Sequence, residues 1–289
     1  MLKNTMKTSV LLASLGGLIV GVAALLGNGS SSAIFIGLAI ALVMVGGSYW
    51  FSDRLALASA KAVIVDEHQA PEFYGLIRSL AERAGLPMPR VAISPSEQPN
   101  AFATGRGPNH AVVCATQGLL RTMPRDELEG VMAHELMHVR HRDILIGSVA
   151  AAIATAISAV AQMAMFASMF GGRNDREREN PLGVLLVALV APIAASLIQM
   201  AVSRSREFDA DRGAAALLGT GEPLARALER IESVAARIPM NVPPAQAQAY
   251  IHNPLAGQKR RGGGLDMAKL FSTHPATEER IRRLRSAGA

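Results

Sequence analysis

Cysteine is nearly absent from this chain. The 289 residues contain one, Cys114, so no disulfide can form within the chain. It lies in the apolar run Ala111–Ala115, which is typical of a small buried strand residue rather than a nucleophile. Basic runs are scarce as well. The only strongly basic one, Lys259–Arg261, has no interleaved aromatic residues, so the net charge of +6 does not indicate nucleic-acid binding.

Charged residues are almost absent from four long apolar segments: the first contains only Lys7, near its start, and the other three contain none. Each is long enough to cross a bilayer, which takes about 20 apolar residues. No A-x-A-like cleavage site follows the first segment, so we expect a retained anchor rather than a signal peptide. The sequence therefore predicts transmembrane helices at Met6–Leu26, Ala33–Phe51, Ile144–Phe170 and Leu182–Val202.

The basic residues that flank these segments predict an orientation, because lysine and arginine are enriched in cytoplasmic loops. The side expected to be cytoplasmic carries Lys3, Lys7, Arg54, Lys61, Arg140, Arg142, Arg204 and Arg206, against Arg173, Arg176 and Arg178 on the other. We therefore expect four parts. Residues 1–52 hold two membrane helices, 53–143 the first half of a cytoplasmic domain, 144–202 a membrane hairpin, and 203–289 the second half.

The first cytoplasmic part contains the expected strands. Pro71–Ala84 is amphipathic and starts with a proline, which suits the first turn of a helix. Val91–Ile93, Asn100–Thr104 and Ala111–Ala115 are strand candidates, and the last two are separated by the turn Gly105–Asn109. We expect a small antiparallel sheet. A central helix starting near Thr122 should follow and continue into the third membrane segment.

That central helix contains His134-Glu-Leu-Met-His138, which matches the H-E-x-x-H pattern in its meaningful context. Helical geometry places His138 about 40° around and about 6 Å along the axis from His134, so both imidazoles can reach one ion. Glu135 lies close enough to act on a water molecule at the metal without being a ligand. The motif predicts a zinc protease in which Glu135 takes the water's proton and later passes it to the leaving amine.

A catalytic zinc needs a third protein ligand, and the sequence offers two candidates. His141 shares a helix face with His134 but lies about 10 Å along the axis, which is too far for a rigid helix. Glu207 lies just beyond the fourth apolar segment and is the better candidate. Asp211 follows on the same helix face and could orient a ligand imidazole through its second nitrogen.

Several segments together resemble the HtpX-type membrane endopeptidases, bacterial relatives of the CaaX prenyl proteases. They are His134–His138, Ser203–Asp211, Asn100–Gly105 and Leu270–Arg280. The resemblance implies Glu207 as the third zinc ligand, Asp211 as its supporting carboxylate, and an active site facing the cytoplasm at the bacterial inner membrane. It also implies cleavage of misfolded or damaged membrane proteins. Ala276 departs from the family pattern, in which a second proline is expected.

The expected fold is mainly α, with four transmembrane helices and a cytoplasmic zincin-like α+β domain. Substrate would pair its backbone with an edge strand made of Asn100, Ala101, Phe102, Ala103 and Thr104, unless this is an ordinary hairpin strand. His274 is either a group that stabilises the oxyanion or a plain residue before the last helix. The expected partners are protein substrates and the lipid bilayer.

Two other functions are compatible with parts of the sequence. A membrane scaffold with structural zinc would have no use for the base Glu135. A prenyl-peptide processing enzyme would be expected to have more than four membrane segments.

Overall fold

The computed structural model describes residues 29–144, 204–235, 251 and 275–286, together with single residues between positions 6 and 24. The second predicted membrane segment forms α2 (Ser31–Trp50), and α3 (Ser52–Ser59) follows it. The first predicted segment is described only at scattered residues, and the last two lie outside the described residues except for Ile144. Within the described part, no single helix meets the length and hydropathy of a bilayer crossing. Ile34–Gly47 and Ser52–Ser59 meet them only as a pair bent by 70°.

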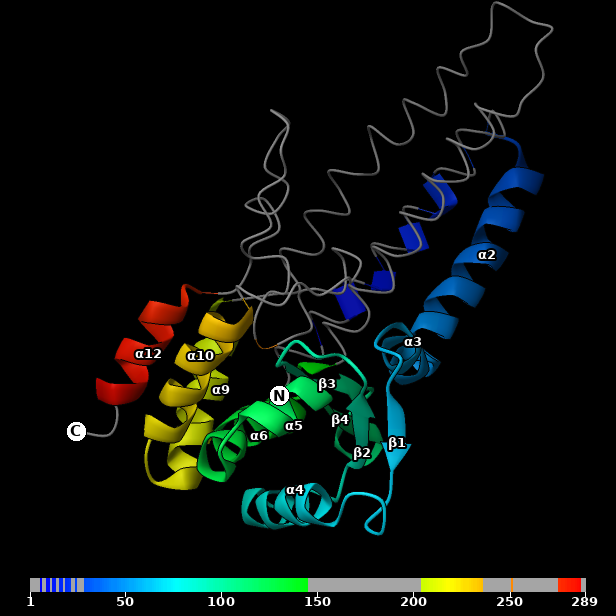
Figure 1. Ribbon diagram of the computed structural model, residues 1–289. Coiled ribbons are helices and arrows are strands. Elements are labelled where there is room, and N and C mark those ends of the chain that lie inside the picture. The colour runs from blue at the N-terminus through cyan, green and yellow to red at the C-terminus, as the bar shows by residue number, and fades with distance from the viewer. Residues whose placement is uncertain are drawn as a thin grey trace, which may run out of the picture.

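Four strands form one sheet in the order β1-β2-β4-β3 (Figure 1). They are β1 (Val63–Val65), β2 (Arg90–Ser94), β3 (Ala101–Gly105) and β4 (Ala111–Thr116). The prediction of an antiparallel sheet is wrong, because β2 and β4 run parallel while the other two pairs are antiparallel. The physical reason is the short connection 95–100. It carries the chain to the sheet edge, and the β3–β4 hairpin then inserts β4 beside β2.

The two faces of the sheet pack against different helices. Val91, Ala101 and Val113 point into the main core with α4 (Pro71–Ala84) and the central helix α6 (Arg125–His141). Phe102 and Cys114 point to the opposite face, together with residues of α3. The alternation follows from the two-residue period of a strand. Cys114 is fully buried, as predicted, and this burial raises the pKa of its thiol.

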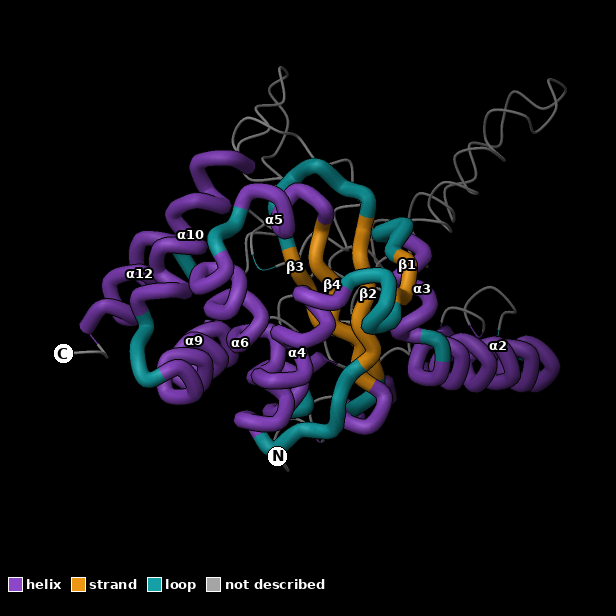
Figure 2. The backbone as a smooth tube through the Cα atoms, turned by 60° about the horizontal axis from the view of Figure 1, so that its bottom comes forward, coloured by secondary structure: helices purple, strands orange, loops and turns teal. Residues whose placement is uncertain are grey.

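Helix α6 lies at the centre of the helical layer (Figure 2). It contacts α4, α9 (Arg204–Leu218) and α10 (Glu222–Ala235), and α10 in turn packs on α12 (Thr277–Ser286). The backbones of α6 and α10 meet at Gly130, where an added Cβ would lie 2.6 Å from the Leu224 nitrogen. A short helix α5 (Gln117–Thr122), capped by the Thr116 hydroxyl, joins β4 to α6.

The central helix ends sooner than the sequence predicted. It stops at His141, and Arg142 adopts the left-handed conformation with φ of 57°, which is typical of a helix C-terminus. The Asp143 amide then donates to the His138 carbonyl over 3.2 Å. The expected continuous helix into the third membrane segment is therefore wrong. The turn after His141 brings Asp143 back beside His138 instead of extending the helix.

Candidate active site

His134 and His138 face each other from successive turns of α6. Their Nε2 atoms lie 3.0 Å apart, and the two rings meet edge to face with centroids separated by 4.6 Å. His134 is 1% exposed. Helical spacing alone places the two side chains on one face, and burial against the neighbouring helices fixes their rings. The arrangement is that expected of two ligands for one ion.

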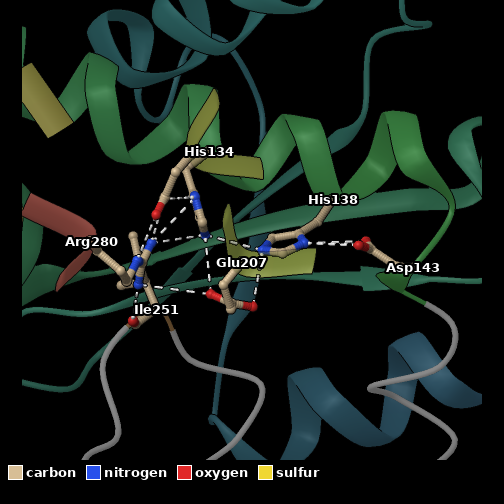
Figure 3. Close-up of polar contacts among 7 residues, drawn as sticks. His134, His138, Asp143, Glu207, Ile251 and Arg280 are labelled. Carbon is tan, nitrogen blue, oxygen red and sulfur yellow. Dashed lines mark hydrogen bonds and ion pairs between the residues drawn. The ribbon is translucent and has the colours of Figure 1, made fainter. Parts of the chain in front are cut away.

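Helix α9 brings a carboxylate to the same point (Figure 3). The Glu207 oxygens lie 3.7 Å from His134 Nε2 and 3.7 Å from His138 Nε2. The helices approach closely because Gly213 has no side chain at the contact, where a Cβ would lie 2.7 Å from Met137 Cγ. One donor atom from each of His134, His138 and Glu207 lies within 4.8 Å of the others. Two imidazoles and a carboxylate fit a zinc-type metal ion.

Each of these two imidazoles is oriented through its other ring nitrogen by a carboxylate. Asp211 Oδ1 lies 2.9 Å from His134 Nδ1, and both Asp143 oxygens lie 3.2 Å from His138 Nδ1. Such contacts fix the tautomer and the ring orientation of a metal-binding histidine. Asp211 was predicted for this place, whereas Asp143 was not. The C-terminal turn of α6 is what brings Asp143 to the site.

Arg280 of α12 completes this network. It is 2% exposed and binds Asp211 through two hydrogen bonds, Nε to Oδ2 at 2.9 Å and Nη2 to Oδ1 at 2.7 Å. Its Nη1 donates to the Ile251 carbonyl at 3.2 Å and lies 3.7 Å from Glu207 Oε2. The buried guanidinium therefore faces two carboxylates of α9 and ties α12 to the site.

The electrostatics of the site follow from burial and from these pairs. Burial opposes ionisation of Asp211, but Arg280 and His134 outweigh it and lower the pKa of Asp211 to about 2. Burial also opposes protonation of His138, yet Asp143 and Glu207 raise its pKa to about 10. For His134, burial dominates and lowers the pKa. Three carboxylates, Asp143, Glu207 and Asp211, thus lie around the two histidines, and the Arg280 guanidinium offsets part of their charge.

Glu135 is 3% exposed beside the two histidines. Burial, with a contribution from Glu207, raises the pKa of Glu135 to about 7, although His138, Arg280 and the Ala103 amide act in the opposite direction. The Ala103 amide belongs to β3 and donates to the Glu135 carboxylate. A carboxylate with a pKa near neutrality can accept and return a proton at physiological pH.

Strand β3 lies at the edge of the sheet and beside α6. The Thr116 amide donates to the Asn100 carbonyl, so the alternation of an antiparallel pair turns the backbone groups of Ala101 and Ala103 away from β4. Three of these outward groups already have partners within the chain. The Ala103 amide donates to Glu135, and the Ala101 amide donates to the Asn100 side-chain oxygen over 3.1 Å. The Ile251 amide donates to the Ala101 carbonyl over 3.1 Å. Strand β3 is therefore an edge strand, and Ile251 pairs with part of its outward side; substrate binding along this edge stays a prediction.

The remaining sequence candidates have different outcomes. His141 is half-buried and is not part of the ligand cluster. His274 lies outside the described residues. Arg206, expected at a membrane flank, is only 8% exposed, and burial lowers its pKa. Sequence reasoning missed Asp143 and Arg280 as site residues. Asp143 directly follows the basic end of the motif helix, and no pattern in the sequence marks it.

A helix that carries H-E-x-x-H, a glutamate from a second helix and an adjacent edge strand define a metallopeptidase. Residues 67–287 match the model of Peptidase family M48, and the chain belongs to this family. The prediction of a metalloprotease is confirmed.

Relatives described as "Protease HtpX homolog" from Burkholderia mallei (strain SAVP1) and Burkholderia thailandensis are each 52% identical over 285 residues. The match covers 97% of this chain and 96% of each relative.

Among solved structures, the fold resembles that of S. mikatae Ste24p, with a TM-score of 0.52 and 20% sequence identity. That similarity covers 98% of this chain but 66% of the Ste24p chain, so this protein spans about two thirds of its length.

Proposed function

We propose that this protein is an integral-membrane zinc endopeptidase that cleaves misfolded or damaged membrane proteins from the cytoplasmic side of the bacterial inner membrane. The observation that carries the proposal is the convergence of His134, His138 and Glu207 beside the buried Glu135. His134, His138 and Glu207 would hold one zinc ion. When bound, zinc supplies Lewis-acid polarisation of the scissile carbonyl and of the attacking water.

The protein's own residues account for the rest of the reaction. Glu135 accepts the proton of the attacking water and returns it to the leaving amine, a role for which a pKa of about 7 is well placed. Asp211 and Asp143 hold the two imidazoles in the tautomer that binds metal. Before α12, His274 would donate a hydrogen bond to the oxyanion.

Substrate would bind as an extended strand along the outward edge of β3, from Asn100 to Thr104. Backbone hydrogen bonds give affinity that nearly any extended sequence can supply. This suits an enzyme that acts on unfolded segments of many proteins. The Ala103 amide lies beside Glu135, so the edge leads directly to the catalytic carboxylate.

Membrane placement is supported by the exposed apolar surface of α2. Phe35, Leu42 and Val43 are 71%, 67% and 75% exposed, which is costly for side chains of this size in water. The proposal keeps the four-part organisation, with membrane segments in residues 1–52 and 144–202 and the peptidase domain in residues 53–143 and 203–289. Ser96→Cys, on a Cys114→Ala background, should react with an impermeant thiol reagent only after cell lysis. Labelling of intact cells would contradict the cytoplasmic orientation.

The chemistry is tested on full-length protein purified in detergent, by measuring zinc content and peptide hydrolysis together. Glu135→Gln should retain about one zinc per chain and lose roughly 10²–10⁴-fold in turnover. Glu207→Ala should lose both zinc and activity, whereas His141→Ala should retain both. If His141→Ala strips the metal and Glu207→Ala does not, the ligand assignment is wrong.

A further inference from the structure

A cavity of about 610 Å³ lies away from the catalytic residues, at the end of the sheet where α2 gives way to α3. Its lining comes from the end of α2, the start of α3, the start of β2 and the turn between β3 and β4. Figure 1 shows the end of α2 leading into α3 beside the sheet. The volume is within the range of small-molecule sites. The peptidase mechanism makes no use of it.

Positive charge dominates the lining. Arg54, Arg90 and Arg106 face the cavity, against one carboxylate, Asp53. Arg90 pairs with Asp53, and the pKa of Asp53 is lowered because this pair outweighs the effect of burial. Within the described ranges, no carboxylate lies within 4.0 Å of the Arg54 or Arg106 guanidinium. The cavity therefore retains two cations for an anionic ligand.

Aromatic side chains hold both of these guanidinium groups. The Arg106 Cζ lies 4.2 Å from the Trp50 ring centroid, and the Arg54 Cζ lies 5.4 Å from the Phe51 ring centroid. The turn that carries Arg106 depends on Gly105, whose φ is +121° and whose Cβ, if present, would lie 2.2 Å from the His110 carbonyl oxygen. The cationic groups are thus positioned before any ligand binds.

The cavity also has an apolar wall. Gly46 and Gly47 of α2 line it, and a Cβ added at either position would meet no atom within 4 Å, so there is open space beside the helix. The exposed apolar surface of α2 continues from this point toward the other end of the helix. Tryptophan and arginine at the end of such a helix are typical of the membrane–water interface. A free anion could bind to the two arginines but would make no contact with the apolar wall at Gly46 and Gly47.

We propose that the cavity binds the phosphate headgroup of an anionic phospholipid, with Arg54 and Arg106 on the phosphate and an acyl chain along Gly46 and Gly47. This inference rests on the membrane placement in the proposed function. It assigns a lipid site at the junction of α2 with the peptidase domain. The bound lipid would fix the height of that domain at the membrane surface.

Trp50 provides the test, since it is the only tryptophan in the chain. The full-length protein is reconstituted in phosphatidylcholine vesicles containing increasing fractions of brominated phosphatidylglycerol or brominated phosphatidylcholine, whose bromines quench nearby tryptophan. Phosphatidylglycerol should reach half-maximal quenching at a mole fraction roughly 10- to 30-fold lower, as expected for two arginines near a phosphate. Arg54→Gln with Arg106→Gln should abolish this preference, while Arg54→Lys with Arg106→Lys should retain most of it.

The matched control removes two exposed arginines elsewhere, Arg78→Gln with Arg282→Gln, and should keep the preference for phosphatidylglycerol. Equal quenching by both lipids in the unmodified protein overturns the lipid site, as does a preference that survives in the glutamine pair. Loss of the preference in excess inorganic phosphate would identify a free-anion site and overturn the lipid assignment. If neither lipid quenches Trp50, both the lipid site and the membrane placement are overturned. Peptide hydrolysis is measured separately and tests the peptidase activity alone.

Discussion

Replacing Arg280 with methionine should destabilise the protein strongly, even without metal. Arg280 and Asp211 are 2% and 4% exposed at their side chains and share two hydrogen bonds of 2.7 and 2.9 Å. Methionine fills much of the same space without charge, so the main effect is to leave the Asp211 carboxylate buried beside Glu207 without its cation. Helix α12 also loses its hydrogen bond to the Ile251 carbonyl.

The expected magnitude follows from the burial of this pair. Removing one partner of a buried ion pair costs about 3–5 kcal/mol, because the remaining charge is left uncompensated. One kcal/mol shifts the melting temperature by about 2–4 °C in a domain of this size, so Arg280→Met should lower it by roughly 6–20 °C. Asp211→Asn added to Arg280→Met should recover much of this loss, since the buried carboxylate is then neutral.

The assay is thermal unfolding in detergent with a chelator present, so that changes in metal binding do not contribute. Arg282→Met is the control, because Arg282 lies on the same helix, its side chain is 75% exposed, and Glu279 is its only ion-pair partner among the described residues. That exposed pair should be worth at most about 1 kcal/mol. If Arg280→Met melts within about 2 °C of Arg282→Met, or if the double variant is less stable than Arg280→Met, the reasoning is refuted.

Three further predictions concern other parts of the structure. Asp143→Asn should weaken metal binding by roughly 10–100-fold, since the His138 imidazole loses its orienting carboxylate; metal titration that finds unchanged affinity would contradict this. Ala103→Pro should cut peptide hydrolysis sharply while metal content and melting temperature change little, because the Ala103 amide faces the outer edge of β3 and donates to Glu135 rather than to β4. A fully active, metal-loaded variant would exclude both the outer edge of β3 from substrate binding and this hydrogen bond from catalysis. Gly130→Ala should destabilise by about 1–3 kcal/mol through a clash with the Leu224 backbone, whereas Gly75→Ala, in open space on α4, should stabilise by about 0.5–1 kcal/mol; chemical denaturation of the pair checks both signs.

Local patterns predicted most of the residues that meet at the candidate active site. His134, Glu135 and His138 are close in space because a helix places residues four apart on one face, and that is fixed by sequence spacing alone. The same argument paired Glu207 with Asp211 on a second helix. The hairpin that joins β3 to β4 was also predictable, because its glycine turn lies between two apolar runs.

Other features depended on contacts between distant segments. The sequence contains the β3–β4 hairpin but not its place in the sheet, so the parallel pairing of β2 with β4 could not be predicted from turn signals. Ala101 and Ala103 are two residues apart, so their backbone groups face the same side of β3. Which side that is depended on the pairing with β4.

The sequence by itself determined the kind of chemistry, because ligand types and helical spacing are local properties. Only the tertiary structure decided which residues support that chemistry. Asp143 reaches His138 through a left-handed turn after α6, and Arg280 reaches Asp211 across 69 residues of chain. Burial of the Arg280 charge requires a partner from another helix, and burial of the Asp143 charge requires the turn that returns it to His138. The free-energy cost of burying these charges is offset only by contacts that form in the folded protein. For that reason no local pattern in the sequence predicts Asp143 or Arg280 as site residues.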